Sequence, residues 1–248
     1  MSSQRLWHFV LFLFWLLLSS HLSADIHVED DLGREITLSK PAQRVISLAP
    51  HLTEVVYAMG GGDRMVATVA WSDFPEEAKS LPVIGSNNKI NYEALLAYKP
   101  DLVLVWRSGN GENIIKRLAS LGLNVFVNEP RKLGGIPNTL HKIGRLLGKE
   151  LESEETIHQF QATLEGLQSK YQQVGKVSVY YQIWQSPLIS FGGEHLVSDV
   201  LQLCGAQNIF SEVKPLVPRI GVESVLAADP EVIIVGQYTD VEVAFEYW

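Results

Sequence analysis

The sequence of 248 residues contains one cysteine, Cys204, which excludes an intrachain disulfide and a zinc site built from cysteines. It also lacks an excess of basic residues. Lys and Arg number 20 against 28 Asp and Glu, which gives a formal net charge of −8, and the acids are spread along the chain. Because nucleic-acid binding requires a basic surface, we expect no nucleic-acid partner.

Short catalytic motifs are missing as well. The chain has no Gly-x-Ser-x-Gly elbow, no Walker loop and no His-Glu-x-x-His pair. His51 and His195 have no second histidine at metal-binding spacing, so each is interpreted as a capping or hydrogen-bonding residue. We therefore expect a protein without enzymatic activity, with no catalytic residues, no metal site and no cofactor.

The first 24 residues have the pattern of a secretory signal peptide. Arg5 supplies a positive charge, Phe9 to Leu18 is an unbroken apolar run, and Ala24 is a small residue suited to cleavage. The run is short for a membrane span, although an uncleaved anchor is the alternative. The pattern predicts export, and no cysteine follows the run to carry a lipid.

Short apolar runs alternate with helical patterns along the rest of the chain, after a predicted hairpin over residues 26–38. Predicted strands cover residues 44–49, 65–69, 102–106, 124–127, 177–183 and 232–235, and predicted helices cover 52–59, 92–97, 113–121, 136–147, 194–203 and 222–228. This alternation is typical of an α/β fold in which helices cover both faces of parallel sheets.

Two stretches of the chain match each other without a gap. Glu93 to Val105 and Glu223 to Val235 both contain Glu, Leu-Ala and Pro-acid followed by an apolar strand. Between them, Leu151 to Val174 has apolar residues at alternating spacings of three and four, which predicts one long helix. We therefore predict an N-terminal α/β lobe (25–148), a linking helix (149–174) and a C-terminal lobe (175–248) that is shorter by one helix–strand–helix block.

Large flat side chains follow several predicted strands. In open α/β sheets, ligands bind beyond the carboxyl ends of the strands. The residues at these positions are Pro50, His51, Trp71, Trp106, Trp184 and Phe191. Aromatic faces suit a large, partly apolar ligand, so we predict that these residues line a cleft between the lobes.

Glu93 and Glu223 begin equivalent helices in the two lobes. A carboxylate near a helix N-terminus is favoured by the helix dipole, which explains each glutamate by itself. The repetition of both also suits a surface that docks onto basic sites of a partner, because exposed charges set orientation and association rate.

Several longer motifs resemble those of a known family. They are Arg44-Val-Ile-Ser-Leu-Ala-Pro-His-Leu-Thr-Glu54, Trp71-Ser-Asp-Phe-Pro75, Asn91-Tyr-Glu93, Lys99-Pro-Asp101, Val105-Trp-Arg-Ser-Gly-Asn110 and Cys204-Gly-Ala-Gln-Asn-Ile-Phe210. From Arg44 to Trp248 the chain resembles the helical-backbone class of periplasmic substrate-binding proteins of ABC importers, and within it the cobalamin-binding (vitamin B12-binding) family. The family has tryptophans where this chain has Ser86-Asn87-Asn88 and Leu216-Val217-Pro218.

The resemblance implies a monomeric periplasmic carrier that holds cobalamin between two Rossmann-like lobes. It implies that Trp71 and Trp106 contact the ligand, that Pro50 and His51 lie beside it, and that Glu93 and Glu223 dock onto an inner-membrane ABC permease. A single stiff helix between the lobes predicts a small closure on binding. Two alternatives stay open: a haem or iron–siderophore carrier of the same class, with His51 or a tyrosine on iron, and an envelope-anchored sensor or interaction module.

Overall fold

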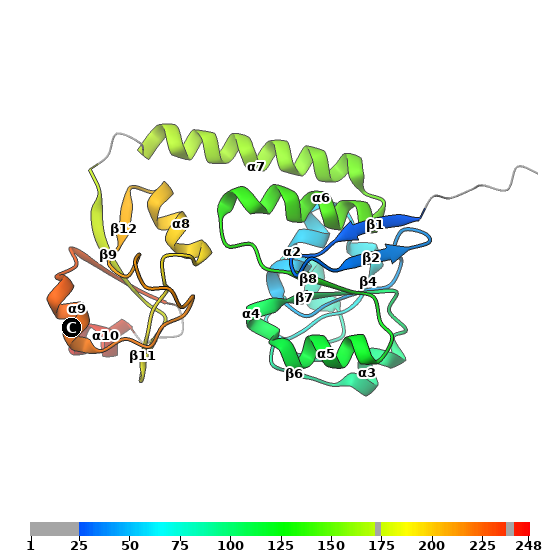
Figure 1. The fold of residues 1–248 in the computed structure, drawn as a ribbon, viewed down its shortest axis with the longest axis horizontal. Helices are drawn as coiled ribbons and strands as arrows, with labels where there is room; N and C mark the ends of the chain where they lie inside the picture. The colour runs from blue at the N-terminus through cyan, green and yellow to red at the C-terminus, as the bar shows by residue number, and fades with distance from the viewer. Residues whose placement is uncertain (1–24, 172–174, 237–240) are drawn as a thin grey trace, which may run out of the picture.

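The two halves of the chain form separate parallel sheets, with one long helix passing over both (Figure 1). This is seen in a computed structural model that describes residues 25–171, 175–236 and 241–248. The α/β fold with two lobes on parallel sheets is confirmed. The predicted signal segment, residues 1–24, lies outside the described residues.

The N-terminal sheet has four parallel strands in the order β4-β3-β7-β8. Their bounds are β3 (Val45–Ser47), β4 (Met65–Ala67), β7 (Leu102–Trp106) and β8 (Val125–Asn128). Strand β7 has the predicted bounds, and the others differ from the prediction by a few residues at their ends. The antiparallel hairpin of β1 (Ile26–Glu29) and β2 (Glu35–Leu38) precedes this sheet, as predicted.

Both faces of this sheet are buried. Alternate residues of β7 point to opposite sides, so Leu102 and Leu104 pack in one apolar cluster while Val103 and Val105 pack in the other. The first cluster is completed by the hairpin, α2 (Pro50–Ala58) and α6 (Ile136–Leu147), and the second by α3 (Tyr92–Ala97) and α5 (Glu112–Ser120). The continuous apolar strands predicted from the sequence are thus covered on both sides.

The C-terminal sheet has three parallel strands in the order β12-β9-β13. The strands of this sheet and the helices of the same lobe are β9 (Val177–Gln182), α8 (Leu196–Leu203), β12 (Ala206–Asn208), α9 (Val222–Ala228), β13 (Val232–Val235) and α10 (Val241–Tyr247). Its buried apolar cluster is small and centres on Tyr180, Phe210 and Val225. Most of the buried apolar residues therefore belong to the N-terminal lobe.

Several short elements were not predicted. Of the expected loop 108–111, residues 108–110 lie in helix α4 (Arg107–Asn110). The expected loop 184–193 contains the hairpin of β10 (Trp184–Gln185) and β11 (Leu188–Ile189). The hairpin of β5 (Gly85–Ser86) and β6 (Lys89–Ile90) and the 3-10 turns η1 (Gly62–Arg64), η2 (Glu76–Ser80) and η3 (Leu133–Gly135) are further examples. Elements this short contain too few residues to produce a periodic apolar pattern.

Helix α7 (Glu150–Tyr171) is the linking helix, and residues 172–174 of the prediction lie outside the described residues. It packs along α6, where Gly144 of α6 faces the buried Ser153 of α7. Ile157 adds the apolar contact to the N-terminal lobe. Among the described residues, no helix has the length and apolar character needed to cross a membrane.

The contact between α6 and α7 can be tested with two glycine variants. A Cβ on Gly144 would lie 2.5 Å from the Cβ of Ser153, so we expect Gly144→Ala to lower the free energy of unfolding by about 1–3 kcal/mol, as overpacking does. Gly166, in α7, has open space around it, and Gly166→Ala should raise the free energy of unfolding by roughly 0.5–1 kcal/mol. Urea unfolding measures both, and a Gly144→Ala protein as stable as the wild type would contradict this packing.

Candidate ligand-binding site

A cavity of about 290 Å³ lies between the two lobes. The N-terminal lobe contributes residues at or just after the carboxyl ends of β3, β7 and β8, together with part of α6. The C-terminal lobe contributes the start of α8 and one residue of a loop. The lining residues are His51, Val55, Trp106, Asn128, Glu129, Pro130, Arg131, Ile136, Thr139, Glu194, His195, Leu196 and Leu216. The strand ends of the N-terminal sheet thus converge on a space that the second lobe closes.

His51 and Trp106 form one wall of this cavity. Their rings lie 5.4 Å apart in an edge-to-face arrangement, an attractive geometry for aromatic groups. Gly109 lies so close to Trp106 that a Cβ there would come within 1.8 Å of the indole. A side chain at position 109 would therefore displace the ring.

The side chain of Asn110 forms hydrogen bonds to three backbone segments behind this wall. Its side-chain amide donates to the carbonyl oxygens of Leu48 (2.9 Å) and Asn87 (2.6 Å), and its Oδ1 accepts a hydrogen bond from the backbone N–H of Trp106 (2.7 Å). The side chain is buried, so these bonds are protected from water. They fix the backbone on both sides of the His51–Trp106 pair.

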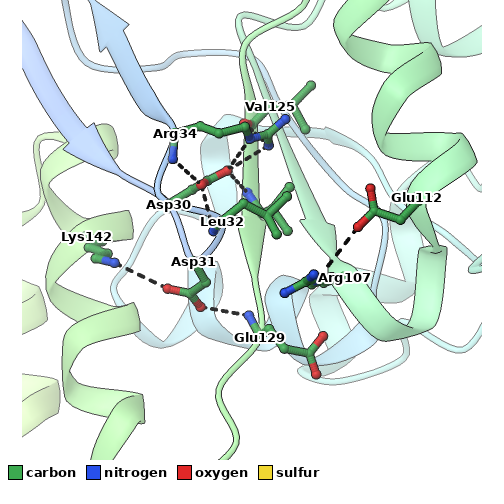
Figure 2. A network of polar contacts seen from close by, with 10 residues as sticks. Asp30, Asp31, Leu32, Arg34, Arg107, Glu112, Val125, Glu129 and Lys142 are labelled. Carbon is green, nitrogen blue, oxygen red and sulfur yellow. Dashed lines mark hydrogen bonds and ion pairs between the residues drawn. The ribbon is translucent and has the colours of Figure 1, made fainter.

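Glu129 connects the ends of strands β7 and β8. Its carboxylate accepts hydrogen bonds from the backbone N–H (2.7 Å) and the hydroxyl (3.0 Å) of Ser108, which follows Trp106 in helix α4. Its own N–H donates to the carboxylate of Asp31 at 2.7 Å, from the turn between β1 and β2 (Figure 2). The cavity wall is thus tied to the N-terminal hairpin.

Polar contacts join the lobes beside the cavity. The carboxylate of Asp199 in α8 accepts a hydrogen bond from the N–H of Leu133 (2.8 Å) and pairs with Lys132 (3.4 Å). Arg131 pairs with Glu194 at 3.0 Å. Both ion pairs are partly exposed, so they contribute more to orientation than to stability.

The two histidines of the cavity stay neutral near pH 7. Burial lowers the pKa of His51 to about 4, against an opposing effect of the Asn128 side chain, and burial lowers the pKa of His195 to about 4. His195 is the N-cap of α8, where its Nδ1 accepts a hydrogen bond from the N–H of Val197, and its ring stacks on Phe191 at 4.1 Å. The predicted capping role of His195 is confirmed.

The other predicted ligand residues lie outside the lining of this cavity. Pro50 begins α2, and Phe191 reaches the site only through its stacking on His195. The side chains of Trp71 and Trp184 are 72% and 47% exposed. Trp71 also has a φ of +70°, a strained conformation for a bulky residue that is most often found at functional sites.

Sequence reasoning missed the residues at the carboxyl end of β8. Asn128, Glu129, Pro130 and Arg131 all line the cavity, and they stand just after a strand that the sequence predicted. The rule that ligands bind beyond the carboxyl ends of the strands selected His51 and Trp106. It would also have identified these residues if it had been applied to this strand.

The described residues contain no cluster of three or more His, Cys, Asp or Glu side chains able to hold a metal ion.

Comparisons with known proteins point to one family. A family model described as periplasmic binding protein matches residues 45–242. A vitamin B12-binding protein from Vibrio campbellii is 35% identical over 198 residues, which cover 80% of this chain and 72% of the relative. One from Yersinia pestis is 36% identical over 211 residues, which cover 85% and 75%.

Solved structures show the same relationship. The crystal structure of a periplasmic vitamin B12 binding protein from Vibrio cholerae has a TM-score of 0.75 at 31% identity and covers 84% of this chain and 83% of its own. A periplasmic heme binding protein from Pseudomonas aeruginosa has a TM-score of 0.72 at 24% identity, with coverages of 83% and 76%. The second likeness concerns the fold alone.

The two partly buried histidines of the cavity predict a loss of stability in acid. An unfolded histidine titrates near pH 6.5 and these two near pH 4, so the unfolded state binds more protons between these values and stability falls as pH decreases from 6.5 to 4. His195→Asn keeps a good N-cap residue but cannot titrate. We expect its urea midpoint to fall less than that of the wild type over this range, and equal slopes would contradict the assignment.

Proposed function

Because the chain belongs to the periplasmic binding protein family, we propose that it is a non-enzymatic carrier that captures cobalamin between its two lobes and delivers it to an ABC permease. The observation that carries the proposal is the interlobe cavity walled by His51 and Trp106, in a chain more than 30% identical to proteins named for vitamin B12 binding. Export through the N-terminal signal would place it in the periplasm.

A corrinoid suits the character of this site. The wall of His51 and Trp106 is uncharged at pH 7, and Ile136, Leu196 and Leu216 add apolar surface. Pockets for drug-sized ligands measure roughly 300–1,000 Å³, and cobalamin is larger than such ligands. We infer that it extends past the cavity of about 290 Å³ and is also contacted by Pro50, Trp71, Trp184 and Phe191.

Haem or an iron–siderophore is the second candidate. His51 is neutral and lines the cavity, and a neutral imidazole is the form that ligates iron. A Soret band that shifts when haem is added would favour this candidate. The cation in the cavity lining, Arg131, is already paired with Glu194 at 3.0 Å, so the haem carboxylates would lack a free basic partner there, which favours cobalamin.

Binding can be measured by calorimetry with cyanocobalamin. We expect one site per chain in the wild type, and Trp106→Ala should weaken binding about tenfold or more, because a buried aromatic side chain contributes roughly 1.5–3 kcal/mol. Leu151→Ala changes an exposed residue of α7, away from the cavity lining, and should bind as the wild type does. Absence of binding by the wild type, or equal affinity of the two variants, would overturn the proposal.

Glu93 and Glu223 are the proposed contacts with the permease. Both are exposed, and each is the second residue of its helix, α3 or α9. Equivalent positions in the two lobes suit a permease with two equivalent subunits, each offering a basic site.

Transport assays test this docking. The double variant Glu93→Gln/Glu223→Gln should keep the cobalamin affinity of the wild type while uptake through the reconstituted permease falls, and the residual uptake should depend less on salt. Glu165→Gln, at an exposed position of α7, is the control and should leave uptake unchanged. Wild-type uptake by the double variant would rule out both glutamates as docking residues.

A further inference from the structure

The side chain of Asn128, the last residue of β8, has a determined orientation. It is fully buried, and its Nδ2 donates hydrogen bonds to Oδ2 of Asp31 (3.1 Å) and to Oγ1 of Thr139 (2.8 Å). An ionised carboxylate can only accept hydrogen bonds. The amide NH₂ must therefore face Asp31, and Oδ1 must point the other way.

Asp31 is itself held firmly in place. Its carboxylate accepts hydrogen bonds from the N–H of Glu129 at 2.7 Å and from Nζ of Lys142 at 3.2 Å (Figure 2). Lys142 belongs to α6, so the tip of the N-terminal hairpin is fastened both to the end of β8 and to the helix beside it. The hydrogen bond from the Asn128 amide to this carboxylate is charge-assisted, so a flip of the amide is unfavourable.

The remaining atom, Oδ1 of Asn128, is a buried acceptor without a hydrogen-bond partner among the described residues. Asn128 and His51 line the same cavity, and the Asn128 side chain raises the pKa of His51 against the larger effect of burial. A buried acceptor needs a donor. The N–H of a neutral His51 can supply one, and the other ring nitrogen then carries a lone pair that can accept a hydrogen bond.

We propose that His51 is the hydrogen-bond acceptor of the cavity, that it receives an N–H from a primary carboxamide of the ligand, and that Asp31 is the positioning residue that fixes its tautomer through Asn128. The ligand part rests on the proposed function, because corrinoids carry carboxamides around the ring. A carboxylate in the same place has no N–H and would turn its lone pairs toward that of the imidazole. The site therefore selects amide-bearing corrinoids over their acids.

The tautomer can be tested without any ligand. Nitrogen-15 NMR of the imidazoles, assigned with His51→Phe, should show one neutral tautomer of His51 at pH 7. Asp31→Asn lets the amide of Asn128 turn over and should give a mixture of tautomers. Glu35→Gln changes an exposed residue of the same hairpin and should leave the signal unchanged. A wild-type mixture, or an unchanged tautomer in Asp31→Asn, would overturn the role of Asp31.

The ligand part is tested by calorimetry with cyanocobalamin and its monocarboxylic acid derivatives, in which one carboxamide is hydrolysed. The wild type should bind at least one derivative about tenfold or more weakly than the amide, as sites built for a hydrogen bond do. His51→Phe keeps a ring beside Trp106 but has no acceptor, so it should weaken cyanocobalamin binding and abolish this discrimination. His51→Asn keeps an acceptor and should retain part of it.

The outcomes separate this inference from the proposed function. A His51→Phe protein with the wild-type ratio of affinities would overturn the amide contact while leaving the carrier function standing. A wild-type protein that binds no corrinoid would overturn the carrier function together with the amide contact, and the tautomer measurement would still decide the link from Asp31 through Asn128 to His51.

Discussion

The carboxylate of Asp199 and the bonds it accepts hold the two lobes at the separation on which the cavity depends. It reaches from α8 to Leu133 and Lys132 of the other lobe, beside the Arg131–Glu194 pair. Partly exposed ion pairs contribute about 0–1 kcal/mol each, so these contacts orient the lobes without locking them. Helix α7 is continuous over 22 residues and limits how far they can separate. These features agree with the prediction of a small closure on ligand binding, which stays a prediction.

The two lobes differ in how firmly they hold their share of the site. His51, Trp106 and Asn128 lie at the carboxyl ends of the strands of a sheet whose two faces are both buried, and Asn110 and Asp31 fix the loops around them. The C-terminal lobe has a small apolar cluster and contributes the start of one helix, capped by His195. A cavity with one rigid wall and one less firmly packed wall suits recognition, because preorganised groups lose little entropy when the ligand binds.

Sequence reasoning was strongest where the signal is local. Helix α6, helix α9, strand β7 and strand β13 have the predicted bounds, since each is a periodic or continuous apolar run ended by glycine, proline or a charged residue. The strand-end rule selected His51 and Trp106, and both line one cavity, while their role in ligand binding stays a prediction. It was not applied to β8, and so Asn128 and Glu129 were missed. Helix α4 and the β10–β11 hairpin were missed because their few residues depend on contacts with distant parts of the chain.

By itself, the sequence determined the units of this protein: which segments form strands and helices, that they repeat, and that one long helix connects the halves. Hydrophobic periodicity is a property of neighbouring residues, so it needs no knowledge of the fold. Only the tertiary structure decided which side chains share a cavity and in what chemical state. Asp31, in the turn of a hairpin that is distant in sequence, accepts a hydrogen bond from Asn128. His195 faces the N-terminal lobe only because α7 and the contacts of Asp199 bring the C-terminal lobe there. Burial, which sets the pKa of both histidines, likewise exists only once the lobes are assembled.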